Sequence, residues 1–385
     1  MNFGTSRASA IENLNRFVDQ NLFEYSKLRN FDYGPDNRSN ISCLSPYITH
    51  GVISELEVIK KSLSKFSFSK NEKFIQEVLW RTYWKGWLEL RPNVWTDYLN
   101  ELKKIREEFK DNQNYRNAIE GNTNIECFNE WIKELKETNY LHNHARMWFA
   151  SIWIFTLDLP WQLGAEFFMK HLFDGDAASN TLGWRWVAGI QTQGKNYIAR
   201  ESNIRKFTNQ RYMNTALNEN ALPLENPKTY SLKEVKKLHT KQKYKNIVLF
   251  ESDLNVNGKN FFFENYENVY LLLLKNKSRN VKLDDAVLNF KTTLQEAFAS
   301  EITNSKIVNE DDIKNLNEGF DVLYPSIGEN MDFLNREIKN ISKLYFIALR
   351  EDIFCWQFSK KGFFNFKKNI PEVINYLLHK DDLFN

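Results

Sequence analysis

Residues 139–186 carry the stretch that decides the fold, NYLHNHARMWFASIWIFTLDLPWQLGAEFFMKHLFDGDAASNTLGWRW. Two histidines, an asparagine and an arginine (residues 142–146) stand at the head of a long aromatic and apolar segment. The loop DGDAASN (residues 174–180) follows, and then two tryptophans spaced two residues apart. Burying so many polar groups without partners would cost roughly 1–3 kcal/mol each. We therefore expect this stretch to surround a large ligand that is both polar and aromatic.

The composition is that of a soluble globular protein of two domains. The 385 residues exceed the roughly 250–300 at which a single core stops growing. Hydrophobic residues make up 42% and charged residues 26% of the chain, both ordinary values. Ten of the 11 tryptophans lie between Trp80 and Trp186, a concentration that core packing alone does not require. A net charge of +3 permits contact with nucleic acid without demanding it.

Several protein classes are disfavoured. The three cysteines are widely spaced and odd in number, so neither a disulfide framework nor a zinc site is indicated. The histidines show no zinc-protease spacing, and the N-terminus has no apolar signal core. The apolar runs fall short of the ~18 residues of a membrane span. We expect a cytoplasmic protein with no bound metal and no membrane contact.

Apolar periodicity predicts a mainly helical N-terminal domain, residues 1–215. The expected helices cover about 9–28, a segment from about 54, 71–90, and 128–155 with a restart after Trp161. Residues 100–121 are charged and predict a surface helix and loop.

The second half of the chain has a different pattern. A polar segment rich in proline and lysine predicts a linker over 216–244. Short apolar runs at 246–250, 269–274, 321–324 and 344–349 alternate with helical patterns at 284–302, 329–338 and 370–378. This alternation predicts a parallel α/β domain over 245–385. The domain shows no glycine-rich phosphate motif, and the lysines around residues 363–368 are more simply a solvated surface.

Two further segments have both a functional and a plain explanation. Glu77, Trp80, Arg81 and Trp84 share one helical face, which fits either a solvated ion pair beside core tryptophans or a cleft wall that stacks a planar ligand. The Ser-Cys-Leu-Ser-Pro segment at 42–46 precedes a helix. Hydroxyls and free N–H groups there can bind an anion, although capping and turn formation explain the residues more simply.

Taken together, the motifs resemble the photolyase/cryptochrome family from about Leu14 to Tyr212. They are the Tyr25/Arg29-Asn30-Phe31 helix end, SCLSPYITHGVIS, EVLWR, YLHNHARM and DGDAASNTLGWRW, in that order. The resemblance implies an α-helical FAD-binding domain, followed here by a smaller α/β domain with a parallel sheet. In this family FAD lies folded in a U shape inside a bowl of helices.

The resemblance also implies the residues that bind FAD. They are Tyr25, Ser42, Leu44, Ser45, Arg81, Asn143, Arg146, Asp174, Asp176 and Asn180. Tyr25 and the 42–45 segment match positions that hold the phosphates. Arg146 matches a residue over the flavin ring, with Asp174 as its partner acid. Asn180 matches the position that faces flavin N5.

For the substrate, the resemblance implies a pyrimidine dimer flipped out of UV-damaged DNA. Glu77, Trp80, Met147 and Trp186 match the residues that line its cavity. Aromatic faces replace the stacking lost on flipping, at ~1–3 kcal/mol per base, and a carboxylic acid can stabilise a developing radical anion. The implied activity is that of a deoxyribodipyrimidine photo-lyase, in which excited reduced FAD splits a cyclobutane dimer by electron transfer. Glu77 and Asn180 are the implied catalytic residues.

Tryptophans matter for reduction of the flavin, and here the chain departs from the family. Trp184 and Trp161 match the first two members of the electron-transfer chain, also counted as catalytic. Ala118 stands at the position of the third. Trp131, Trp148 or Trp153 is a candidate replacement, although core packing is the simpler role for any one of them.

Other departures keep a second function open. His144 replaces an arginine that contacts DNA, and Ile41 and Asn129 replace a threonine and an aspartate. The family's α/β antenna domain ordinarily precedes the flavin domain, so an antenna pigment cannot be assigned. The alternative is a cryptochrome-like blue-light sensor or flavin-binding regulator. Repair of (6-4) photoproducts is less favoured, with His142 and His144 as its support. We expect a monomer.

Overall fold

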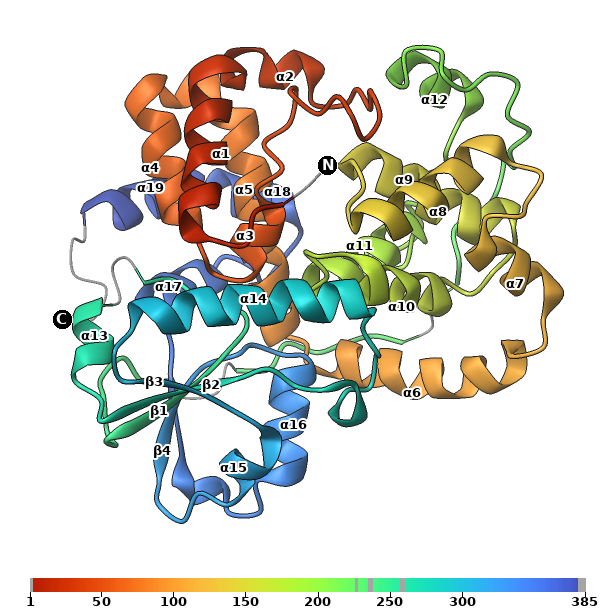
Figure 1. Ribbon diagram of the computed structural model, residues 1–385. Helices are drawn as coiled ribbons and strands as arrows, with labels where there is room; N and C mark the ends of the chain where they lie inside the picture. Colours follow the sequence, from red (N-terminus) through yellow and green to blue (C-terminus); the bar gives the residue numbers. More distant parts are fainter. Residues whose placement is uncertain (1–2, 226–227, 235–237, 257–259, 380–385) are drawn as a thin grey trace. The chain divides into compact units, whose positions relative to one another are not determined.

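The computed structural model describes residues 3–225, 228–234, 238–256 and 260–379 (Figure 1). Helices predominate, and the later part of the chain forms a five-stranded parallel sheet. The predicted fold class, a helical domain followed by an α/β domain, is confirmed. The chain forms two compact units that alternate along the sequence. We call residues 1–2, 24–42 and 93–230 the helical unit, and residues 3–23, 43–92 and 231–385 the mixed unit.

The predicted boundaries of 1–215, 216–244 and 245–385 follow the sequence and remain a prediction.

The helical unit consists of short helices whose ends follow from local sequence. Its elements are α2 (Tyr25–Leu28), α6 (Asn93–Phe109), α7 (Gln113–Glu120), α8 (Glu126–Thr138), α9 (Asn143–Ser151), η2 (Ile152–Thr156), α10 (Trp161–His171), α11 (Ala177–Val187) and α12 (Glu201–Phe207). Gly121 (φ 77°) ends α7 and Asn139 (φ 53°) ends α8, both in the left-handed region where such residues are favoured. The predicted break before Trp161 is confirmed, because α10 begins directly after Pro160.

Aromatic side chains fill the core of the helical unit. Phe128, Trp131, Trp148, Phe149 and Trp153 are completely buried. Helices α10 and α11 pack closely at Gly164, because a Cβ atom at this position would lie 2.2 Å from the Trp184 ring. Glycine at this position therefore sets how closely the two helices pack.

The mixed unit combines the first helices of the chain with its C-terminal half. Its helices are α1 (Arg7–Gln20), α3 (Ser45–Thr49), α4 (Glu55–Lys65), α5 (Phe68–Glu89), α13 (Asn260–Glu264), η3 (Asn276–Ser278), α14 (Asp285–Glu301), α15 (Glu310–Lys314), α16 (Glu329–Glu337), η4 (Ile341–Lys343), α17 (Arg350–Trp356), α18 (Phe363–Lys368) and α19 (Ile370–His379). The single helix predicted over 9–28 is interrupted at Asn21 and continues as η1 (Leu22–Glu24) and α2. A capping box between Ser54 and Glu57 begins α4, where the sequence predicts a helix start.

The sheet has strand order β3-β2-β1-β4-β5, and all its pairs are parallel. The strands are β1 (Asn246–Phe250), β2 (Asn268–Leu272), β3 (Ser305–Val308), β4 (Phe320–Leu323) and β5 (Leu344–Ile347). Four of them were predicted. Strand β3 was not predicted, because it is an edge strand whose central residues are exposed and it lacks the apolar run of a buried strand.

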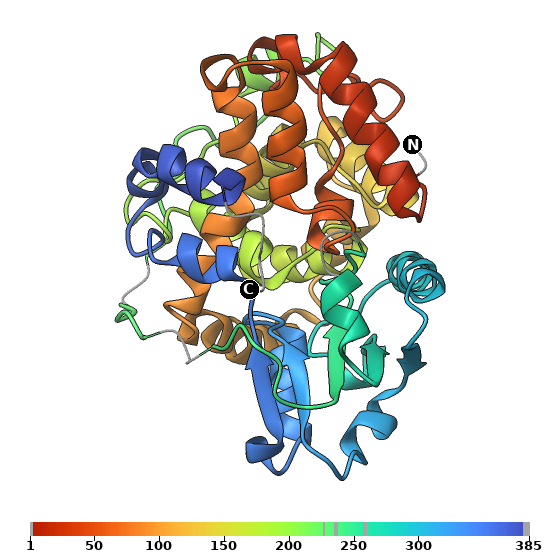
Figure 2. The same ribbon diagram turned by 90° about the vertical axis from the view of Figure 1, so that its left-hand side faces the viewer.

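Helix α5 packs against the C-terminal helices, which lie far away in sequence. In Figures 1 and 2, α17–α19 (blue) lie beside α4 and α5 (orange). A Cβ atom at Gly86 of α5 would lie 2.6 Å from Cδ1 of Trp356 in α17. The Tyr83 hydroxyl donates to the Lys361 carbonyl at 3.0 Å. Within the described ranges, none of the helices has the length and apolar character needed to cross a membrane.

Candidate functional site

An ion pair between α9 and the loop before α11 is the best-defined polar contact among the predicted site residues. Arg146 Nη1 and Nη2 donate to the two carboxylate oxygens of Asp174 at 3.0 and 2.9 Å. Its Nε donates to the Leu141 carbonyl at 2.9 Å. Asp174 is only 8% exposed. This bidentate geometry fixes the plane of the guanidinium group. A fixed plane is what a residue needs if it is to lie against a flat ring.

The start of α11 holds two more predicted residues. Oδ1 of Asp176 accepts from the backbone N–H groups of Ala178 and Ser179 at 3.0 and 2.9 Å, so Asp176 caps the helix. Asn180 lies one turn further on, and its Nδ2 donates to the Ala165 carbonyl at 2.7 Å. Because a carbonyl can only accept, this contact assigns the amide orientation. The Oδ1 atom of Asn180 is thereby left as an acceptor for another group.

Buried polar atoms near these residues lack protein partners in the part of the chain that the structure describes. They are His142 Nε2, Ser179 Oγ, Thr181 Oγ1 and Trp184 Nε1. Burial lowers the pKa of His142 to about 3, and its Nδ1 accepts from the His144 N–H at 3.1 Å. His142 is therefore neutral, with its proton on Nε2. Leaving such donors unpaired is costly, so this region fits a polar ligand.

His144, by contrast, is fully used inside the protein. Its Nδ1 lies 2.9 Å from the Asn30 carbonyl and its Nε2 lies 3.1 Å from the Tyr197 hydroxyl. The ring stacks on Trp148 with centroids 4.1 Å apart, and burial lowers its pKa. A neutral ring with both nitrogens occupied has no free group for DNA, which weakens the argument for a (6-4) lesion.

The tryptophans predicted for electron transfer have different neighbours. Trp161 stacks on Tyr98 with centroids 5.5 Å apart. Trp184 meets Trp153 edge-on at 6.2 Å, and Trp153 meets Tyr115 edge-on at 6.0 Å. Ala118 stands where the family has the third tryptophan of the chain. Of the three candidate replacements for that tryptophan, Trp153 is the one whose ring contacts Trp184. Trp131 and Trp148 stack on each other at 5.6 Å.

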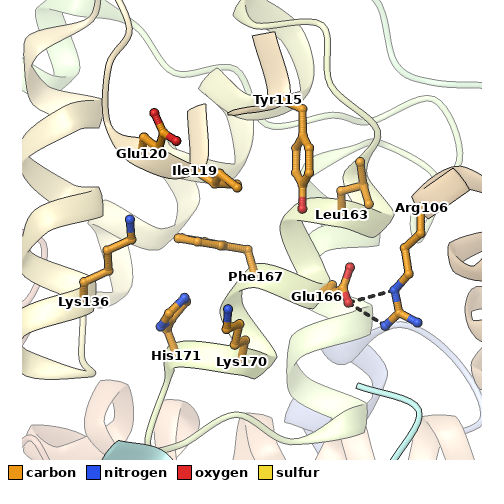
Figure 3. A pocket seen from close by; sticks show the side chains of 10 residues that line it. All are labelled: Arg106, Tyr115, Ile119, Glu120, Lys136, Leu163, Glu166, Phe167, Lys170 and His171. Atoms are coloured by element: carbon orange, nitrogen blue, oxygen red, sulfur yellow. Dashed lines mark hydrogen bonds and ion pairs between the residues drawn. The ribbon is translucent and has the colours of Figure 1, made fainter. Parts of the chain in front are cut away.

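Tyr115 also lines a cavity of about 400 Å³ in the helical unit, which the sequence analysis missed (Figure 3). The lining residues are Arg106, Tyr115, Ile119, Glu120, Lys136, Leu163, Glu166, Phe167, Lys170 and His171. Nε of Arg106 donates to Glu166 at 2.8 Å, and the Tyr115 ring points into the cavity. These residues come from four helices and form no motif, so no local pattern announces the cavity.

In the mixed unit, the α5 face carries the other predicted residues. Arg81 Nη1 pairs with Glu55 of α4 at 2.9 Å, and its Nη2 donates to the Thr49 carbonyl. The Trp80 ring stacks on Phe363 of α18 with centroids 3.5 Å apart and an interplanar angle of 11°. One face of Trp80 is thus covered by Phe363, which belongs to the segment whose lysines are predicted to form a solvated surface.

The remaining predicted residues occupy both units. The helical unit contains Tyr25, Ser42, Asn143, Arg146, Met147, Trp161, Asp174, Asp176, Asn180, Trp184 and Trp186. The mixed unit contains Leu44, Ser45, Glu77, Trp80 and Arg81. Asn143 is exposed, and Trp186 stacks on Tyr197 with centroids 5.7 Å apart. The chain turns sharply at Cys43 (φ 52°) just before α3 begins at Ser45.

Comparison with known proteins shows which proteins part of this chain is similar to. Residues 74–224 match a family model described as the FAD binding domain of DNA photolyase. The deoxyribodipyrimidine photo-lyase of Vibrio cholerae is 28% identical over 202 residues, which cover 51% of this chain and 41% of the relative. The Streptomyces griseus enzyme of the same name is 30% identical over 177 residues, covering 43% and 38%. The chain therefore spans less than half the length of these relatives.

Among solved structures, a bacterial class III photolyase from Agrobacterium tumefaciens aligns with a TM-score of 0.45 and 26% identity, covering 53% of this chain and 43% of that one. Residues 74–224 are thus similar to the FAD-binding domain of DNA photolyase, and the curated relatives that share this similarity are photo-lyases. FAD is the cofactor of the matched domain. The bidentate Arg146–Asp174 pair and the unpaired donors of His142 and Ser179 lie inside the matched segment and fit such a cofactor.

Proposed function

We propose that this protein is a light-driven DNA-repair enzyme that splits cyclobutane pyrimidine dimers in UV-damaged DNA. The observation that carries the proposal is the bidentate Arg146–Asp174 pair inside the segment that matches a photolyase FAD-binding domain. The curated relatives that match this segment carry the name of that enzyme. The proposed partner is damaged DNA.

When bound, FAD would supply light-driven donation of one electron to the dimer and would accept the electron back once the ring has opened. On the protein side, Arg146 is held flat by Asp174, and Asn180 offers Oδ1 as an acceptor. His142 Nε2 and the Ser179 hydroxyl are buried donors that a polar cofactor edge would satisfy. The other proposed contacts to FAD are Tyr25, Ser42, Leu44, Ser45, Arg81, Asn143 and Asp176.

For the substrate, Glu77, Trp80, Met147 and Trp186 are the proposed lining residues. The dimer gains one electron, its two interbase carbon–carbon bonds break, and the electron returns, so the reaction has no net redox change. Stacking on Trp186 would replace part of the stacking lost when the bases leave the duplex. The Glu77 carboxyl would hydrogen-bond the dimer as negative charge develops on it.

The second candidate is a cryptochrome-like light sensor or flavin-binding regulator. The covered face of Trp80 favours it, because Phe363 occupies a surface that a flipped base would otherwise use. Ala118 at the position of the third tryptophan points the same way.

A repair assay separates the two functions. Under blue light with a reductant, the purified FAD-loaded protein should restore thymine absorbance to UV-irradiated oligonucleotides. Replacing Glu77 with alanine should slow repair by roughly 10²-fold, the usual cost of losing one donor to developing charge, while FAD stays bound. Glu108→Ala, at an exposed position of α6, is the matched control and should leave the rate unchanged. Photoreduction of FAD without binding or repair of damaged DNA would instead support the sensor.

A further inference from the structure

Helix α18 presents an aromatic side chain to solvent. Phe364 is 83% exposed, more than any other aromatic residue in the described ranges. Its neighbours Phe363 and Phe366 are buried, at 8% and 0% exposed. Helical periodicity explains this division, because Phe363 and Phe366 are three residues apart and share a face, whereas Phe364 lies about 100° away.

The helix is held rigidly on α5. Phe363 stacks on Trp80, and Phe366 meets Tyr83 edge-on with centroids 5.6 Å apart. The chain entering α18 is pinned as well, since Arg91 Nη2 donates to the Lys360 carbonyl at 2.7 Å and Tyr83 donates to the next carbonyl. An exposed ring on a fixed backbone loses little freedom when it binds a partner.

Lysines flank this ring on both sides. Lys360 and Lys361 precede it and Lys368 follows it, and all three are exposed. No carboxylate pairs with any of these three within the ranges that the structure describes, whereas Lys367 pairs with Glu72 at 3.1 Å. Lys360, Lys361, Phe364 and Lys368, which we call the α18 surface, thus combine three exposed lysines with one exposed aromatic ring within nine residues of sequence.

We propose that this α18 surface binds single-stranded DNA, with Phe364 stacked on a base and the three lysines against phosphates. Base–aromatic stacking and phosphate neutralisation are the two elements of sequence-tolerant single-strand binding. A duplex hides its base faces, so single strands are preferred. The proposal deepens the DNA-binding part of the proposed function and rests on it in the choice of DNA as partner.

The proposal is tested by binding of an undamaged thymidine 20-mer to the FAD-loaded protein in the dark. Fluorescence anisotropy measures this binding. Phe364→Ala should weaken binding by roughly 5- to 100-fold, the loss of one stacked base, and leave the salt dependence unchanged. Phe23→Ala removes another exposed aromatic ring, 65% exposed, and should have no effect. Both positions are exposed, so thermal melts should match the parent protein.

The lysines are tested by salt dependence. Single-strand affinity falls with salt by a logarithmic slope of about 0.7 per neutralised phosphate. The triple variant Lys360→Ala, Lys361→Ala, Lys368→Ala should therefore flatten this slope by about 2. Lys103→Ala with Lys104→Ala, at exposed positions of α6, is the control and should not change it.

Unchanged affinity and slope in both α18 variants would overturn the proposal. So would a change in oligomeric mass on Phe364→Ala with DNA binding intact, because the ring would then contact a second copy of the chain. Loss of repair activity with normal dark binding of the 20-mer would contradict the repair function alone, which keeps the two failures distinguishable.

Discussion

At the residue scale, the candidate cofactor site depends on side chains whose geometry is set by close partners. Asp174 holds both Nη atoms of Arg146, the Ala165 carbonyl holds Asn180, and Asp176 caps the helix that carries Asn180. The Asn180 contact uses Nδ2 and leaves Oδ1 as an acceptor. Preorganisation of this kind lowers the entropic cost of binding.

Loss of the Asp174 charge should loosen the cofactor. In Asp174→Asn the side chain keeps its shape but can no longer accept two charge-assisted hydrogen bonds from Arg146. We expect the free energy of unfolding to fall by about 1–3 kcal/mol and FAD to dissociate more readily on dilution. Urea unfolding and flavin fluorescence measure the two effects. Asp111→Asn, in a surface pair with Arg116, should cost under about 1 kcal/mol, and an equal effect of both variants would contradict this role.

We expect Tyr115 to be an end point for reduction of the flavin through Trp184 and Trp153, because the Trp153 ring meets the rings of both Trp184 and Tyr115 edge-on. Phenylalanine in its place keeps the ring packing but removes the oxidisable phenol. We expect Tyr115→Phe to slow light-driven reduction of bound FAD several-fold, followed by absorbance under blue light, and to abolish a light-induced tyrosyl radical signal. Tyr98→Phe alters the ring that stacks on Trp161 and tests the other route. A slow rate in that variant alone would assign electron transfer to Trp161.

At the element scale, α5 joins the first part of the chain to the C-terminal α/β region within the mixed unit. Glu89, at its last turn, accepts from the Tyr324 hydroxyl and from the Ile327 N–H, both at 2.7 Å. These contacts lie at the carboxyl end of β4, next to the switch in strand order between β1 and β4. Ligands commonly bind at this position in open α/β sheets. In this protein the Glu89 carboxyl group occupies it.

The Glu89 contact should make stability depend on pH. Burial raises the pKa of Glu89 to about 7, with the Tyr324 and Ile327 hydrogen bonds and Lys85 opposing and Asp352 adding to the rise. A raised pKa means that the folded protein favours protonated Glu89. Its contribution is therefore fully present below the unfolded pKa and is lost as the pH rises through about 7.

Between pH 5 and pH 8, we expect this group to remove about 3 kcal/mol from the free energy of unfolding. Glu89→Gln carries no titratable proton and should abolish that part of the pH dependence, as measured by urea unfolding at each pH. Burial also raises the pKa of Glu134 in the helical unit to about 7. Glu134 therefore contributes to the pH dependence of the free energy of unfolding with the same sign, and Glu134→Gln is the control for that contribution. Identical pH profiles for Glu89→Gln and the parent protein would refute the assignment.

At the scale of the whole molecule, the chain divides into two compact units, and each unit is made of segments that are separated in the sequence. The matched FAD-binding segment, residues 74–224, contributes to both units. The α/β region lies outside that segment, and its helices α17 and α18 pack on α5. The C-terminal region therefore contacts the helix that carries Glu77, Trp80 and Arg81, which gives it a direct route to influence their surroundings.

Much of the fold was predictable because its signals are local. The break before Trp161, the capping box at Ser54 and the buried strand at residues 246–250 each depend on neighbouring residues in sequence. The Arg146–Asp174 pair was predictable through a family motif, although its partners lie 28 positions apart. Edge strand β3 was missed because exposure removes the apolar pattern on which such predictions rest.

By itself, the sequence determined the helical and α/β halves and the similarity of residues 74–224 to a photolyase FAD-binding domain, because periodicity, caps and short motifs depend on neighbouring residues along the chain. Only the tertiary structure decided that Phe363 covers Trp80, that Glu89 meets Tyr324, and that Phe364 faces solvent. Glu89 and Tyr324 lie 235 residues apart. No local pattern encodes such pairs, because they depend on how separately formed elements bury their remaining apolar faces against each other.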